Sequence, residues 1–90
     1  MNLSHRALTS IKSKGFRAKP YTDPEGVLRI GYGHRVTPGD GVAPKDLINV
    51  FKGSELLEED VKQIVKQLVK QVPSNITQQE FDQLVLQKYN

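Results

Sequence analysis

Side chains able to do chemistry are concentrated in the first 35 residues of this 90-residue chain, whose formal net charge is +3. Two carboxylates, Asp23 and Glu25, lie there among seven basic residues, which are Arg6, Lys12, Lys14, Arg17, Lys19, Arg29 and Arg35. A carboxylate can serve as a general acid or base, and a basic surface can bind an anionic polymer. The segment therefore indicates either a binding surface for an anion or an ordinary solvated basic face.

Other kinds of chemistry are excluded by the residues that the chain lacks. It contains no cysteine, which rules out disulfides, thiolate zinc sites and a cysteine nucleophile. His5 and His34 are its two histidines, too few for a histidine-rich metal cage. The glycines of Gly31-Tyr32-Gly33 are not followed by the spacing of a phosphate-binding loop. We therefore predict no metal and no cofactor.

The carboxylates and most of the basic residues are expected on a helix and a hairpin that follows it. Leu3, Ala7 and Ile11 recur at helical spacing behind Ser4, a suitable N-cap, which predicts a helix within residues 1–14. Residues 15–35 form two β-type runs that flank a Thr-Asp-Pro-Glu-Gly turn, which predicts a β-hairpin or a small antiparallel sheet.

Three further helices are predicted after the hairpin, over residues 43–52, 54–72 and 77–90. The first is expected to begin near Pro44 and to stop at Gly53. The long helix has acidic residues in its first turns and lysines later, which suits the helix dipole. Thr77 and Glu80 have the spacing of a capping box at the start of the last helix. The whole chain, residues 1–90, is therefore expected to be one α+β domain.

Two stretches of the sequence are distinctive. Residues 14–34 read KGFRAKPYTDPEGVLRIGYGH, and residues 76–85 read ITQQEFDQLV. Both resemble the signature of phage-type lysozymes, the endolysins of glycoside hydrolase family 24. The resemblance implies a lysozyme-like N-terminal lobe, with a helix, a small antiparallel sheet and then three helices, lacking most of the C-terminal lobe.

The resemblance also implies three catalytic positions, of which one keeps its residue type. Lys14 stands at the position of the general-acid Glu, Asp23 matches the catalytic Asp, and Arg29 stands at the position of a Thr that positions water. Glycoside hydrolysis normally needs two carboxyl groups, and a lysine, with a pKa near ~10.4, is a poor proton donor at neutral pH. Lys14 is instead expected to form a salt bridge with Asp23. Other carboxylates weighed as substitute acids are Glu25, Glu58 and Glu59, which are better explained as turn and helix-terminal residues.

The same resemblance and the basic residues suggest where a ligand would bind. The residues expected to contact a substrate or a partner are Arg17, Lys19, Tyr32, Gly33, Arg35, Phe81, Leu84 and Tyr89. Gly31, His34 and Thr77 are expected to be structural, with His34 hydrogen-bonded to an acid such as Asp60. The last helix is expected to leave an apolar face uncovered.

These observations favour a lysozyme-like pseudoenzyme of phage or prophage origin that has lost hydrolysis and serves in binding. A host or phage protein is the preferred partner, and residual contact with peptidoglycan is retained as an option. Two alternatives stay open. One is an active peptidoglycan muramidase fragment completed by another chain, and the other is a mobile-element inhibitor of a host defence or lysis protein.

Further expectations concern the remaining partners and the location of the protein. Nucleic acid is disfavoured because no recognition helix or stacking motif accompanies the basic residues. No membrane span is expected, since the longest purely apolar run is three residues, at 84–86. The N-terminus lacks the apolar run of a Sec-type signal peptide, which predicts a cytoplasmic protein. A homodimer formed through the terminal helix is a further option.

Overall fold

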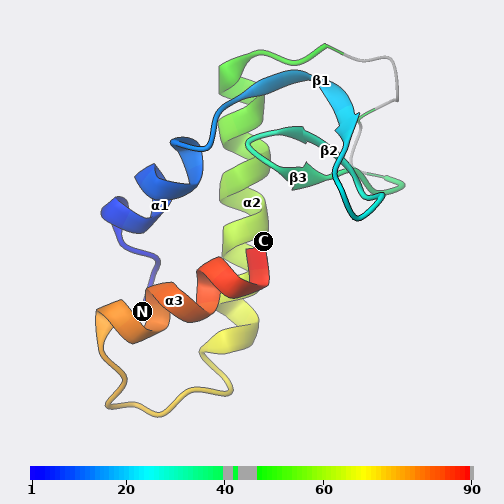
Figure 1. The fold of residues 1–90 in the computed structure, drawn as a ribbon. Helices are drawn as coiled ribbons and strands as arrows, with labels where there is room; N and C mark the ends of the chain where they lie inside the picture. The colour runs from blue at the N-terminus through cyan, green and yellow to red at the C-terminus, as the bar shows by residue number, and fades with distance from the viewer. Residues whose placement is uncertain (40–41, 43–46, 90) are drawn as a thin grey trace.

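The computed structural model describes residues 1–39, 42 and 47–89. Its elements in chain order are α1 (His5–Lys12), β1 (Arg17–Thr22), β2 (Leu28–Gly31), β3 (His34–Arg35), α2 (Val50–Leu68) and α3 (Gln78–Tyr89). The strands form one antiparallel sheet in the order β1-β2-β3, which lies beside the first half of α2 in Figure 1. The expected α+β fold class is therefore confirmed.

The helix α1 begins at the predicted cap and is tied to the other end of the chain. The Ser4 side chain accepts a hydrogen bond from the Ala7 N–H at 3.2 Å, which satisfies one of the free donors of the first turn. The Ser4 hydroxyl and N–H also donate to the Asp82 carboxylate of α3, at 2.5 Å and 3.1 Å. These contacts tie the residue that precedes α1 to α3.

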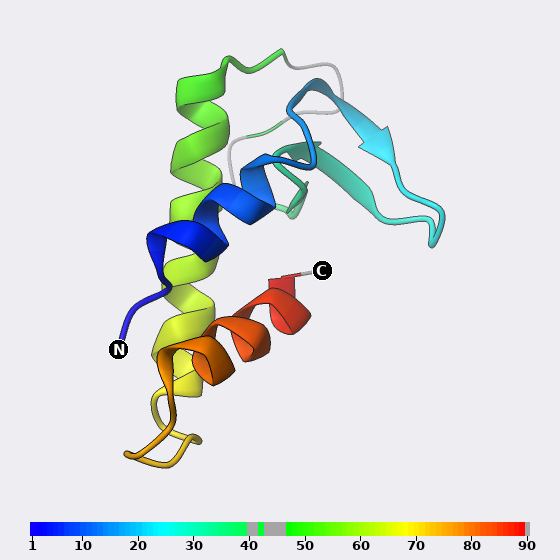
Figure 2. The same ribbon diagram turned by 60° about the vertical axis from the view of Figure 1, so that its left-hand side comes forward.

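The hairpin of β1 and β2 extends away from α2 (Figure 2) and turns at Asp23. One carboxylate oxygen of Asp23 accepts from the N–H groups of Glu25 and Val27, both at 2.9 Å, so the side chain itself closes the turn. The register pairs Arg17 with Gly31 and Tyr21 with Arg29. It shifts between these two pairs, because β1 has more residues than β2 over this interval.

The long helix α2 corrects the expected division between a short helix and a long one. Of the short helix predicted at 43–52, residues 43–46 lie outside the described residues, 47–49 are not helical, and 50–52 form the first turn of α2. Asn49, not Ser54, caps α2 by accepting from the Lys52 N–H at 2.9 Å. The helix ends at Leu68, four residues before the predicted end at 72.

Gly53, predicted as a helix stop, is buried inside α2. A Cβ at this position would come within 2.7 Å of Cε1 of Phe16, so the sheet side of the molecule approaches the helix backbone closely here. The glycine is therefore needed for close packing rather than for ending a helix. The helix α2 continues through Gly53 because the helical residues on both sides of it are stabilised by packing against the rest of the protein.

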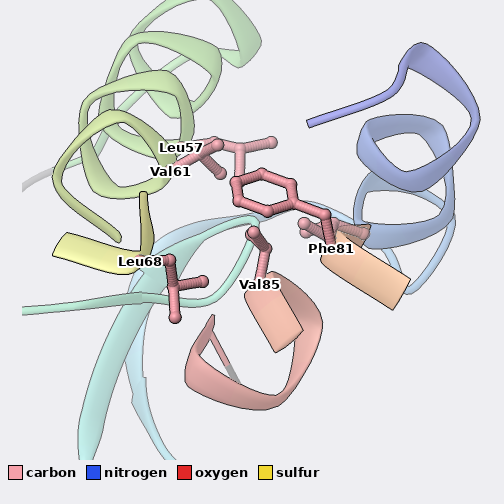
Figure 3. Packing of buried hydrophobic residues seen from close by; sticks show 6 residues of the cluster. Leu57, Val61, Leu68, Phe81 and Val85 are labelled. Atoms are coloured by element: carbon pink, nitrogen blue, oxygen red, sulfur yellow. The ribbon is translucent and has the colours of Figure 1, made fainter. Parts of the chain in front are cut away.

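The core lies between α2 and α3. Phe81 and Val85 of α3 are fully buried against Leu57, Val61 and Leu68 of α2, and Figure 3 shows the Phe81 ring directed toward Leu57 and Val61. Leu84, half-buried, packs against the same cluster. The expectation that Phe81 and Leu84 would face a partner is therefore wrong, since α3 turns its apolar face inward.

None of the described helices combines the length and the apolar character that crossing a membrane requires.

Candidate functional site

A hollow of about 560 Å³ lies beside the hairpin and receives residues from the end of α1, the sheet and the end of α3. We call it the hairpin hollow. Its lining residues are Ile11, Lys14, Gly15, Arg17, Tyr21, Asp23, Pro24, Glu25, Arg29, Tyr32, Gly33 and Tyr89. The three positions singled out for catalysis, Lys14, Asp23 and Arg29, all lie within it. The fold thus brings together groups that the sequence places up to 15 residues apart.

Asp23 is held as an ionised, fully engaged carboxylate. The Arg29 Nε donates to one of its oxygens at 2.8 Å, and the other oxygen accepts the two N–H groups of the turn. The Arg29 hydrogen bond, followed by that from the Val27 N–H, holds the pKa of Asp23 below its ordinary value of 3.8. A carboxylate in this state does not donate a proton at neutral pH.

Arg29 links the turn between β1 and β2 to the turn between β2 and β3. Besides its bond to Asp23, its Nη1 donates to the carbonyl oxygen of Gly33 at 2.8 Å. The side chains of Arg29 and Asp23 are each 14 % exposed, so the ion pair is largely removed from solvent. The pair that was expected between Lys14 and Asp23 is therefore made by Arg29. The cause is the register, which sets Arg29 opposite Tyr21, two residues before Asp23.

Lys14 enters the hairpin hollow from the turn that follows α1. It is an exposed residue at the end of a helix, where a cation is favoured by the helix dipole. Lys14 is one of the residues that line the hollow, so a basic residue stands at the position to which the sequence resemblance assigns a general acid.

Three tyrosines supply the aromatic part of the hollow. The guanidinium carbon of Arg17 lies 4.5 Å from the centre of the Tyr21 ring, and the Lys12 ammonium lies 5.7 Å from that of Tyr32. The Tyr89 hydroxyl donates to the Tyr32 carbonyl oxygen at 2.9 Å. Burial, followed by the negative charge of Asp60, raises the pKa of Tyr89, so its hydroxyl stays protonated.

Some of the ligand-contact residues predicted from the sequence line the hairpin hollow, and others do not. Arg17, Tyr32, Gly33 and Tyr89 line the hairpin hollow, whereas Lys19 and Arg35 do not. Lys19 lies within the irregular part of β1, where the extra residues interrupt the alternation that would have set it beside Arg17. Arg35 lines a separate hollow with Asp60 and Lys88.

Sequence reasoning missed Tyr21 as a lining residue. Its position four residues after Arg17 in a β-type run would have placed both on one face, and this is the signal that could have found it. Glu25, weighed as a substitute acid, also lines the hollow, whereas Glu58 and Glu59 line a different hollow along α2.

The residues assigned to the framework make contacts that support the hollow. His34 Nδ1 lies 2.7 Å from Asp60 Oδ2, the acid expected beside it, and this contact joins β3 to α2. Gly31 has a φ of +68°, and a Cβ there would lie 3.3 Å from Cα of Gly53. Thr77 and Glu80 form the expected capping box, with reciprocal backbone-to-side-chain bonds of 3.0 Å and 3.1 Å.

A search of the described residues finds no group of three or more His, Asp or Glu side chains placed to hold a metal ion.

The geometry of this site can be compared with known proteins. The family model for phage lysozyme matches residues 11–90. The chain belongs to the phage lysozyme family. An endolysin of Bacillus phage B103 is 38 % identical over 93 aligned positions, which cover the whole of this chain and 34 % of that protein.

Solved structures show the same relationship. The endolysin from Escherichia coli O157:H7 phage FAHEc1 superposes with a TM-score of 0.82 at 34 % identity, over all of this chain and 58 % of that one. The muramidase domain of SpmX from Asticaccaulis excentricus gives a TM-score of 0.78 at 29 % identity, over 99 % of this chain and 58 % of that one. This member of the phage lysozyme family thus spans about a third to three fifths of the length of these relatives.

Proposed function

We propose that this phage lysozyme family member is a pseudoenzyme that binds peptidoglycan glycan in the hairpin hollow without hydrolysing it. One observation carries the proposal: Lys14, Asp23 and Arg29 line a single hollow, but Asp23 alone of the three is a carboxylate, and Arg29 neutralises it. The hollow is therefore a concave site in which the positions implied for catalysis do not supply the two carboxyl groups that the reaction needs.

The chemistry argues against hydrolysis at each step. Loss of a general acid typically lowers the rate by ~10²–10⁴-fold. The ammonium of Lys14 also opposes the positive charge that develops on the sugar ring in the transition state. Arg29 holds Asp23 in hydrogen bonds and so withdraws it from the stabilisation of that charge. Glu25 is the remaining carboxylate of the hollow, and it is an exposed turn residue.

The preference for a glycan over a protein partner follows from what the fold covers. The apolar face of α3, expected to dock a partner or a second copy, is buried against α2. The hairpin hollow instead offers three tyrosines with charged and backbone polar groups, a combination suited to the flat faces and hydroxyl groups of sugars.

The test is co-sedimentation with purified peptidoglycan sacculi, with the supernatant analysed for released muropeptides. We expect the chain in the pellet and no muropeptides released. Tyr21→Ser should move the chain toward the supernatant, because Tyr21 lines the hollow. Phe51→Ser, which alters an aromatic side chain that is 78 % exposed and outside the hollow, should leave sedimentation unchanged.

Two results would overturn the proposal. Release of muropeptides by the unmodified chain would show an active muramidase, and Glu25→Gln would then test the one other carboxylate of the hollow. Unmodified chain left in the supernatant would show that glycan is not its ligand.

A protein partner remains the second candidate, supported by a different surface. Leu47, Val50 and Phe51, before and within the first turn of α2, are 67 %, 46 % and 78 % exposed. Neighbouring apolar side chains left in solvent are typical of interaction sites. If this candidate holds, Phe51→Ser abolishes capture of a host or phage protein, whereas Tyr21→Ser does not.

A further inference from the structure

A second face of the long helix α2 lies open beside the face that enters the core. Its side chains recur at alternating intervals of four and three residues, which keeps them on one side of a helix. They are Phe51, Glu55, Glu58, Lys62, Val65 and Val69, and we call them the outer stripe. Val65 is half-buried and the others are exposed, with Phe51 at 78 % and Val69 at 44 %. The outer stripe thus runs from the first turn of α2 to its C-cap.

The middle of the outer stripe is a ridge with a hollow on each side. Glu58 and Lys62 line both hollows. The larger, of about 690 Å³, continues along α2 to Glu59, and the smaller, of about 240 Å³, continues to Val61 on the opposite side of the ridge. The smaller hollow also receives apolar side chains from the N-terminal end of the chain. Helices commonly pair by packing the ridges of one into the grooves of the other, so the shape of this face fits a helix.

The outer stripe is complementary to itself when its direction is reversed. It has an apolar residue near each end, and in its middle an acidic residue is followed one turn later by a basic one. In an antiparallel pair of α2 helices centred on Asp60, Phe51 of one copy faces Val69 of the other. In the same arrangement Glu58 faces Lys62. Each contact occurs twice, because a two-fold axis relates the two copies.

The charges of the outer stripe select the antiparallel pair. Among the residues that the structure describes, neither Glu58 nor Lys62 has an ion-pair partner. A parallel pair would set each of them against its own copy, and like charges that meet across an interface repel. The antiparallel pair sets each against its opposite, and it brings Glu55, which faces Val65, next to Lys66. The partner that these charges fit is therefore a second copy of this chain.

We propose that the outer stripe is a homodimer interface, in which two α2 helices pack antiparallel about a two-fold axis. The terminal helix, through which a homodimer was expected, turns its apolar face toward α2, so α2 supplies the interface instead. The 19 residues of α2 make a helix about 28 Å long and about 10 Å wide, so the contact is smaller than the ~800 Å² per partner of a standard interface. A contact of this size predicts a weak dimer, with a dissociation constant of about 10–100 µM.

The dimer is independent of the glycan binding proposed above. The outer stripe shares no residue with the hairpin hollow. At low micromolar concentration the chain is a monomer, so sedimentation with sacculi and unfolding measurements made there do not depend on the dimer. A chain that pairs but does not bind sacculi, or the reverse, would therefore separate the two proposals.

The experiment is sedimentation equilibrium of the intact chain, at concentrations from about one tenth to about ten times the expected dissociation constant. We expect a monomer–dimer equilibrium. Glu58→Lys and Lys62→Glu should each weaken it about tenfold or more, because each change places like charges opposite each other twice. An equal mixture of the two variants should dimerise again, since every lysine at these positions then faces a glutamate. Both side chains are exposed, and circular dichroism checks that the variants keep the fold.

Two further variants connect the equilibrium to the outer stripe. Lys70→Glu makes the same change of charge as Lys62→Glu on an exposed residue beyond the end of α2 and off the outer stripe, and should leave the equilibrium unchanged. Val69→Ser should weaken the dimer, because Val69 covers Phe51 of the second copy.

Three results would contradict the inference. A chain that stays monomeric at the highest concentration has no such interface. A dimer that Glu58→Lys leaves intact, or that the mixture of variants does not restore, forms through another surface. Equal weakening by Lys70→Glu and Lys62→Glu would show an effect of net charge and not of the outer stripe.

Discussion

At the scale of single residues, Arg29 decides what Asp23 can do. The ion pair at 2.8 Å is 14 % exposed on both sides, so the carboxylate gains a partner and loses contact with solvent. The same arginine reaches the Gly33 carbonyl oxygen and so braces the two turns of the sheet. Arg29 therefore acts on the structure of the site as well as on its charge.

This pair leads to a prediction about titration. Arg29 holds the pKa of Asp23 below 3.8, so Arg29→Gln should raise the midpoint of the Asp23 carboxyl in an NMR pH titration. Arg6→Gln, an equal change on an exposed residue of α1, should leave the midpoint where it is.

The sign of the stability effect follows from the direction of this shift. Because the folded pKa is lowered, ionised Asp23 stabilises the fold above its ordinary value of 3.8, and that contribution is lost as the pH falls through the lowered pKa. Stability in acid should therefore fall less steeply for Asp23→Asn than for the unmodified chain. An unchanged Asp23 midpoint in Arg29→Gln would contradict the assignment.

At the scale of elements, the sheet reaches α2 through two glycines. A Cβ on Gly31 would lie 3.3 Å from Cα of Gly53 and 3.3 Å from the Cδ1 atom of Ile48. Next to this contact, His34 bonds Asp60 of α2. The turn that carries Tyr32 and Gly33 into the hairpin hollow is thus held by backbone packing on one side and a polar contact on the other.

Two alanine substitutions distinguish the effect of close packing on stability from the effect of backbone conformation. Gly31 and Gly26 both have positive φ, +68° and +84°, but a Cβ on Gly26 would have nothing within 4 Å. Gly26→Ala should therefore show the conformational cost alone, about 1 kcal/mol. Gly31→Ala should lower the free energy of unfolding by a further ~1–3 kcal/mol, because the new methyl group overpacks the contact with α2.

Urea denaturation of both variants measures this difference. Equal losses in Gly31→Ala and Gly26→Ala would show that the approach of the sheet to α2 contributes nothing to stability.

At the scale of the whole molecule, α3 completes the core that the rest of the chain leaves open. Phe81 and Val85 of α3 are fully buried. Asp82, which lies between them in the sequence, accepts hydrogen bonds from the N–H and the hydroxyl of Ser4, the residue before α1. Burial raises the pKa of Asp82, but the hydrogen bonds from Ser4 and Gln78 together outweigh it, so the pKa lies below its ordinary value. The two ends of the described chain are therefore linked, and α3 belongs to one cooperative unit with α1 and α2.

Truncation of the central aromatic residue tests this view. Phe81→Ala should cost about 3–5 kcal/mol, a large fraction of the ~5–15 kcal/mol that a domain of this kind possesses. Phe51→Ala, on a side chain 78 % exposed, should change stability by no more than about 0.5 kcal/mol. Thermal unfolding followed by circular dichroism provides both values. A similar small effect for both phenylalanines would place α3 outside the cooperative core.

The sequence by itself determined the features that depend on neighbouring residues. The cap at Ser4, the turn at Asp23 and the capping box of Thr77 are local hydrogen-bonding patterns, so residue type and spacing are enough to predict them. The residue order of the Lys14–His34 motif also predicted the family, because a motif is recognised from residue types and spacing without its three-dimensional setting.

Only the tertiary structure decided which of these residues meet. Gly53 stops a helix in isolation but continues one where Phe16 packs against it, and Phe81 is a candidate contact residue until α2 covers it. The choice of Arg29 over Lys14 as partner of Asp23 came from the strand register, which a local pattern does not encode. Packing and register join residues distant in sequence, and their energies depend on the whole arrangement.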